Sequence, residues 1–195
     1  NWKKFFIKGL GIPVERVFLL QDADATVEKM QRYARKARNL APAGGTLWFV
    51  FIGHGTAMTG DGALVAIDAQ SDVEGLKSRL LSQKTLLDVL NRGKQEKTIA
   101  LFDACFSGRS HDGSPLIKGL QFLVPKYEWK KDMTGKSIVI SAASGNEYAG
   151  PLPGASRPAF SYLALGALQG WADQDKDGKV TAEEMVDYTQ TAMTA

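Results

Sequence analysis

The chain has 195 residues, of which 44% are hydrophobic and 23% charged, and its formal net charge is +3. This length and balance are typical of one globular domain, so we expect residues 1–195 to form a single domain. The small, scattered positive charge argues against nucleic-acid partners, and no apolar run reaches the roughly 20 residues that span a bilayer. The single cysteine excludes an internal disulfide and leaves the cellular compartment open.

The first 52 residues alternate between helical and extended patterns. Residues 2–9 are predicted to be the last part of a helix, and residues 16–20 to form a short strand. Thr26 is predicted to cap a helix that ends before Pro42, because apolar residues recur at helical spacing between them. The uninterrupted apolar run over residues 46–52 then predicts a strand that is buried on both faces of a sheet.

The rest of the chain continues this alternation, which predicts an α/β layer fold. We expect a short strand or hairpin at residues 63–68 and a helix from Ser82 to about Arg92. The later predicted elements are a second buried strand at 97–102, a long connection at 109–136, a third buried strand at 137–142, a helix at 159–171 and a last helix from Thr181.

Two reactive side chains follow two consecutive buried strands. His54 stands between two glycines after the strand at 46–52, and Cys105 follows the strand at 97–102. If the strands are parallel neighbours, both side chains emerge at the carboxyl edge of the sheet, where α/β folds bind ligands. A thiolate nucleophile needs an imidazole that protonates the leaving amine, and backbone N–H groups of Gly55 and Cys105 could bind the oxyanion. The alternative is a structural histidine and an inert buried cysteine.

Longer segments around these two residues carry a more specific pattern. One reads Leu47-Trp-Phe-Val-Phe-Ile-Gly-His-Gly and the other Ile99-Ala-Leu-Phe-Asp-Ala-Cys-Phe-Ser-Gly. They are followed in order by Ile140-Ser-Ala-Ala-Ser-Gly-Asn-Glu and Phe160-Ser-Tyr-Leu. Together these segments resemble caspase-like cysteine peptidases, most of all the bacterial caspase homologues and metacaspases. The separation of 51 positions from histidine to cysteine agrees with the roughly 50 expected in caspases.

The resemblance implies a caspase-like three-layer α/β/α sandwich around a mostly parallel sheet. Residues 1–108 would then correspond to the large subunit of the family, 109–136 to the connecting loop, and 137–195 to the small subunit. The family's first strand, which would neighbour the histidine strand, has no counterpart here. We therefore expect a processed or truncated chain, whose partner is a missing N-terminal segment of the same precursor, or a first strand supplied from elsewhere. Basic residues make self-processing of the connecting loop an expectation, and the alternative is an ordinary surface loop that carries lysines. The basic residues are Arg109, Lys118, Lys126, Lys130 and Lys131.

The resemblance also implies a cysteine endopeptidase that acts on proteins or peptides. Caspases proper carry Gln two residues before the catalytic cysteine and Arg after it, whereas this chain has Asp103 and Phe106. A carboxylate in the pocket would attract Arg or Lys, as in the metacaspases, so we expect cleavage after these residues. The alternative is that Asp103 only orients its loop. The residues that stand where the family's substrate pairs with a strand end are Ser141, Ala142, Ala143 and Ser144.

Residues 173–184 match the twelve-residue EF-hand calcium loop, with Gly178 at the sixth position for the turn. We expect a bound Ca²⁺ that is structural rather than catalytic, because the calcium activation of the metacaspases that this chain resembles is generally attributed to acidic residues elsewhere. The alternative is an Asp-rich turn followed by a capping box at the start of the last helix. The predicted ligands are Asp173, Asp175, Asp177, the carbonyl of Lys179, Thr181 and Glu184.

Two other functions stay open. One is a catalytically weak caspase-like module that acts as a calcium-binding interaction or scaffolding domain. The other is a calcium-binding interaction domain in which Cys105 is incidental. The reactivity of the thiol separates both from a peptidase, because an activated cysteine is alkylated far faster than an inert one.

Overall fold

The structure is a computed structural model that describes residues 1–58, 61–70, 72–104, 106, 136–142 and 159–194. The chain divides into two compact units. One combines Asn1–Val17 with Ala149–Ala195, and the other comprises Phe18–Tyr148.

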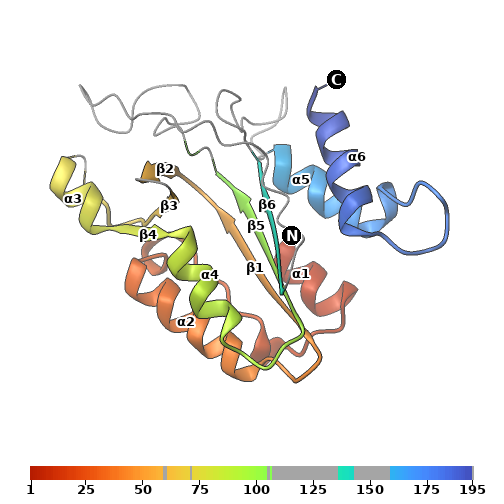
Figure 1. Cartoon of the computed structure of the whole chain (residues 1–195), viewed down its shortest axis with the longest axis horizontal. Helices are drawn as coiled ribbons and strands as arrows, with labels where there is room; N and C mark the ends of the chain where they lie inside the picture. The colour runs from red at the N-terminus through yellow and green to blue at the C-terminus, as the bar shows by residue number, and fades with distance from the viewer. Residues whose placement is uncertain (59–60, 71, 105, 107–135, 143–158, 195) are drawn as a thin grey trace. The chain divides into compact units, whose positions relative to one another are not determined.

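A three-stranded parallel sheet forms the centre of the unit Phe18–Tyr148 (Figure 1). Its strands are β1 (Thr46–Ile52), β5 (Lys97–Asp103) and β6 (Ser137–Ser141), with β5 in the middle. All three strands were predicted from their uninterrupted apolar runs, and the structure confirms their presence. The predicted burial of β1 on both faces is not complete, since most of its residues are half-buried. Such runs are typical of parallel strands, since both faces of a parallel sheet are covered.

Helices α2 (Val27–Leu40) and α4 (Gln83–Asn91) cover one face of this sheet (Figure 1). Each begins at its predicted cap, where a hydroxyl oxygen accepts a backbone N–H three residues later. Full burial of one large apolar side chain contributes about 1.5–3 kcal/mol, so the core between these elements is a main source of stability. Its buried members include Met30, Ala34, Leu47, Leu86, Leu90, Ala100 and Phe102.

A small antiparallel sheet connects the histidine segment to α4. Its strands are β2 (Gly55–Met58), β3 (Asp61–Val65) and β4 (Leu80–Ser82), and α3 (Val73–Ser78) lies between β3 and β4. The sequence predicted only the middle strand, as a short strand or hairpin at 63–68. The flanking strands were missed because they have four and three residues, too few for an alternating pattern.

The strand predicted at residues 16–20 is wrong. The segment starts with the short 3₁₀ turn η2 (Val14–Arg16), and a second turn, η3 (Asp22–Asp24), follows it. The backbone between them is extended at both ends, at Val17 and Gln21. No described strand pairs with it, and an extended segment becomes a strand only where a partner accepts its backbone hydrogen bonds.

The other unit is helical in its described residues. α1 (Trp2–Lys4) continues into η1 (Phe5–Gly9), and α5 (Ala159–Gly166) continues into η4 (Ala167–Trp171). These segments confirm the predicted helices at 2–9 and 159–171. α6 (Ala182–Thr194) is the predicted last helix and contacts α5 and η4. Taken together, the described elements form a mixed α/β fold in which helices flank a parallel sheet. None of the described helices is long and apolar enough to cross a membrane.

Candidate active site and acidic loop

The carboxyl ends of β1 and β5 lie side by side. The two strands are parallel, and the last pair in their register is Ile52 with Asp103. One residue further, the N–H of Gly53 donates a hydrogen bond to the carbonyl of Asp103 at 3.1 Å. Paired residues are 51 positions apart along the chain, which is also the separation of His54 and Cys105. Both predicted positions therefore follow neighbouring strand ends in the sequence, although Cys105 lies outside the described residues.

His54 is half-buried and joins β1 to the antiparallel sheet. Its carbonyl accepts a hydrogen bond from the N–H of Val65 on β3 at 2.9 Å. Gly55, the predicted oxyanion donor, is buried at the start of β2 and pairs with Leu64. The backbone at His54 is thus held between two sheets, while the oxyanion role of Gly55 stays a prediction.

The two sequence neighbours of Cys105 are buried in the core. Ala104 is fully buried and Phe106 is 5% exposed, and both belong to the cluster that α2 and α4 cover. The ring of Phe106 meets that of Phe102 edge-to-face, with centroids 6.4 Å apart and planes at 74°. Sequence reasoning missed this role of Phe106, because the only signal is one aromatic residue that follows a predicted strand and precedes a Ser-Gly pair.

Asp103, the predicted anchor for Arg or Lys, is the last residue of β5 and is 1% exposed. Its neighbour Phe102 faces the core under α2 and α4, so Asp103 points to the opposite face of the sheet. Ile52, its partner in the register, is 47% exposed. Asp103 is therefore a buried acidic group near the strand ends. Its part in substrate binding stays a prediction.

β6 brings two predicted substrate-binding residues to the same edge of the sheet. Ser141 ends β6, is half-buried and pairs with Phe102. The N–H of Ala142 donates to the carbonyl of Phe102 at 2.8 Å, so β5 already uses that donor. A substrate strand would therefore have to use other backbone groups here. Ala143 and Ser144 lie outside the described residues.

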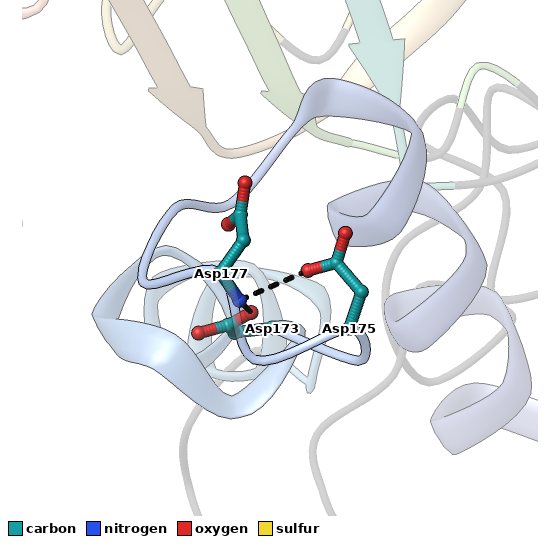
Figure 2. A group of neighbouring side chains, drawn as sticks. All are labelled: Asp173, Asp175 and Asp177. Atoms are coloured by element: carbon teal, nitrogen blue, oxygen red, sulfur yellow. Dashed lines mark hydrogen bonds between the residues drawn. The ribbon is translucent and has the colours of Figure 1, made fainter.

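The acidic loop after η4 belongs to the other unit and gathers three carboxylates. Asp173, Asp175 and Asp177 each offer an oxygen atom, and these atoms lie within 4.8 Å of one another. The N–H of Asp177 donates to the carboxylates of both other aspartates at 3.1 Å (Figure 2). The turn needs left-handed backbone at Lys176 (φ 59°) and Gly178 (φ 80°). These three carboxylates could hold a metal ion, and carboxylate oxygens are among the ligands that Ca²⁺ takes.

The other predicted calcium ligands are arranged differently. The carboxylate of Glu184 accepts hydrogen bonds from the N–H and hydroxyl of Thr181 at 2.8 and 2.9 Å. The hydroxyl of Thr181 in turn accepts the N–H of Glu184 at 3.1 Å, which is the capping box of the alternative interpretation. The hydrogen bonds from Thr181, its N–H first and its hydroxyl second, hold the pKa of Glu184 below its ordinary value. At Lys179, the N–H donates to Asp177 at 2.7 Å, while a role for its carbonyl stays a prediction.

No protein-family model matches the chain, and no curated protein matches it significantly. Any functional assignment therefore depends on the geometry and chemistry of the residues themselves.

Proposed function

We propose that this chain is a caspase-like cysteine endopeptidase, with Cys105 as the nucleophile and His54 as the general acid–base. The observation that carries the proposal is the common offset of 51 residues. It applies to every pair in the β1–β5 register and to the two proposed catalytic residues alike. The proposal includes a three-layer α/β/α sandwich. The described parallel sheet and its helices support this part of the proposal.

The burial of the sequence neighbours of Cys105 supports the same assignment. Ala104 and Phe106 are both buried in the core, so the chain is anchored on either side of the proposed nucleophile. Well-fixed surroundings of this kind favour the precise positioning that a catalytic group needs.

The proposed reaction proceeds through a thioester. The thiolate of Cys105 attacks the carbonyl carbon of the scissile peptide bond, and N–H groups of Gly55 and Cys105 stabilise the oxyanion. The imidazolium of His54 gives its proton to the leaving nitrogen as the C–N bond breaks. The imidazole then takes a proton from water, which attacks the thioester carbon. The C–S bond breaks, the acid product leaves, and the thiolate is restored.

Substrates in this proposal carry Arg or Lys before the scissile bond. The buried carboxylate of Asp103 supplies a negative charge near the strand ends, and a guanidinium can bind such a group in bidentate fashion. Self-processing in the loop 109–136 belongs to the same proposal, because the basic residues there match this preference.

Hydrolysis of matched fluorogenic peptides that end in Arg, Lys or Asp tests the proposal. We expect turnover of the Arg and Lys peptides, and we expect Cys105→Ala to lower it by at least about 10³-fold, as loss of a nucleophile does. Asp103→Asn, which keeps the size of the side chain, is expected to reduce the preference for the basic over the acidic peptides. Cleavage after Asp in place of Arg or Lys would contradict the specificity. Equal turnover by wild type and Cys105→Ala would contradict the mechanism.

We also propose that the acidic loop binds one Ca²⁺ through Asp173, Asp175 and Asp177. The ion would neutralise three convergent carboxylates and crosslink the turn between η4 and α6, which is a structural role. Participation of Glu184 as a further ligand would require that its carboxylate exchange the hydrogen bonds of Thr181 for the ion.

Terbium luminescence tests the metal site without reference to activity. Trp171 lies two residues before Asp173, is 50% exposed and contacts the ring of Tyr162, so it is suited to sensitise a lanthanide in the loop. We expect a saturable Tb³⁺ signal that Ca²⁺ displaces, and a loss of affinity of about tenfold or more in Asp175→Ala. Asp187→Ala removes an exposed carboxylate of α6 outside the loop and is the matched control. Equal affinities of the two variants would exclude a site at the loop.

A further inference from the structure

The outward face of α2 carries positive charge that no carboxylate compensates. The helix has five basic residues and one acidic residue, so its net charge is +4. Two of the five, Lys29 and Arg38, form hydrogen bonds to neighbouring side chains. The other three, Arg32, Arg35 and Lys36, are exposed, and none of them pairs with a carboxylate in the part of the chain that the structure describes.

These three cations are neighbours on the helix surface. Arg32 and Lys36 are four residues apart, and Arg35 is three residues from Arg32, and like charges at such spacings destabilise a helix. Two aromatic rings lie against them. The guanidinium carbon of Arg32 is 5.1 Å from the ring centroid of Tyr33, and Nζ of Lys36 is 5.0 Å from that of Phe18. Because these cation–π contacts already order the side chains, less conformational entropy is lost when an anionic surface binds them.

The exposed face of α6 has the opposite charge at a matching spacing. This helix has three acidic residues and no basic residue. Glu183 and Asp187 are exposed and four residues apart, whereas Met185, on the other side of the helix, is buried. Two carboxylates therefore stand one helical turn apart, about 6 Å along the axis, as Arg32 and Lys36 do on α2.

Exposed apolar side chains lie beside both charged faces. Leu19, next to Phe18, is 51% exposed. Trp171 is 50% exposed and contacts the ring of Tyr188, which follows Asp187, with centroids 6.4 Å apart. Surface ion pairs by themselves contribute little, so a stable interface also needs apolar area that becomes excluded from water. Both faces have such area next to their charges.

We propose that α2 of one molecule docks on α6 of a second copy of this chain, with Arg32 and Lys36 facing Glu183 and Asp187. A second copy is the occupant that the charges favour, because every chain contains both faces and the two match in sign and spacing. In a two-fold arrangement, α2 of each molecule meets α6 of the other, so one dimer uses all four faces and closes. This inference does not depend on the proposed peptidase activity.

Sedimentation velocity over a range of protein concentrations tests the association, with EDTA present so that no metal ion binds the acidic loop. We expect wild type to dimerise reversibly at about 0.01 M salt, where the Debye length is roughly 30 Å, and to be monomeric at about 1 M salt, where it is roughly 3 Å. Charge reversal places like charges opposite each other. The dissociation constant is therefore expected to rise by about tenfold or more in Arg32→Glu/Lys36→Glu and in Glu183→Lys/Asp187→Lys.

A mixture of the two reversed variants makes the expected result specific. Each variant has charges of one sign on both helices, whereas the two variants together are complementary again. We therefore expect the mixture to associate at concentrations where neither variant does so alone. Lys3→Glu/Lys4→Glu is the matched control, because it changes the net charge by the same amount at two exposed residues of α1. We expect this control to dimerise as wild type does.

Several outcomes would overturn the inference. Wild type that stays monomeric at every concentration in low salt would show that no second copy docks. Association that salt leaves unchanged, or that both reversed variants retain, would assign the contact to other surfaces. A mixture of folded variants that fails to associate would contradict the pairing of the two faces. Circular dichroism establishes that the variants fold. Should one reversed variant not fold, the other decides, since loss of its association supports the inference and retention overturns it.

Discussion

Replacement of His54 by alanine is expected to lower the rate of peptide hydrolysis by about 10²–10⁴-fold, the usual contribution of a general acid–base. The imidazole is proposed to protonate the leaving nitrogen and to activate water. Among the described residues just after β1, no other side chain could take over these two roles. His54 is half-buried at the edge of the sheet and is not a member of the core cluster, so the fold should tolerate its truncation.

The measurement is kcat/KM for an Arg or Lys peptide, together with a thermal unfolding curve for each variant. His111→Ala is the control, because His111 is the only other histidine of the chain and has no proposed role. We expect this variant to retain the activity of wild type. Unchanged kcat/KM in His54→Ala would remove the histidine from the mechanism.

Replacement of Phe102 by alanine is expected to lower the free energy of unfolding by about 3–5 kcal/mol, the range for loss of a buried phenylalanine. Phe102 lies in the central strand and is completely buried. Its ring contacts Phe49 on β1, at 5.9 Å between centroids, and Phe106 on the other side. Because β5 is paired with a strand on each side, its backbone cannot easily move in to fill the cavity.

Urea denaturation provides the measurement, with the slope and the midpoint compared between variants. Phe18→Ala is the matched control, since Phe18 is half-buried and stacks on Tyr33 outside the core cluster. We expect it to lose about 1 kcal/mol, near the average for point substitutions. Similar losses in the two variants would contradict the assignment of Phe102 to the centre of the core.

The regular elements of this protein follow from local sequence patterns. Three uninterrupted apolar runs determined the strands of the parallel sheet, since burial on both faces requires such runs. Thr26 and Ser82 determined where α2 and α4 begin, because a hydroxyl oxygen satisfies a free N–H of the first turn without help from the rest of the molecule. The capping box of Thr181 and Glu184 is local in the same way.

Features that need a partner distant in the sequence were decided only by the tertiary structure. The apolar pattern of residues 16–20 predicted a strand. This pattern contains no information on whether another strand accepts the backbone hydrogen bonds of the segment. The short strands β2 and β4 exist because β3 lies between them, and their own residues carry no recognisable period. The loop aspartates converge, as their spacing in the sequence predicts. The carboxylate of Glu184 can either accept the hydrogen bonds of Thr181 or bind an ion, and only the contacts in the folded chain decide between the two.

The candidate site shows the same division. The sequence by itself determined that a histidine and a cysteine follow two strands at a separation of 51 residues. Only the tertiary structure decided that these strands are parallel neighbours and that each residue of β1 pairs with the residue 51 positions later in β5. Position 54 therefore follows the end of one strand as position 105 follows the end of the other. It also decided that Phe106 is a core residue in contact with Gly62, 44 positions earlier in the chain. Such a contact arises from the way the β2–β3 hairpin folds back on the core, and no local pattern encodes it.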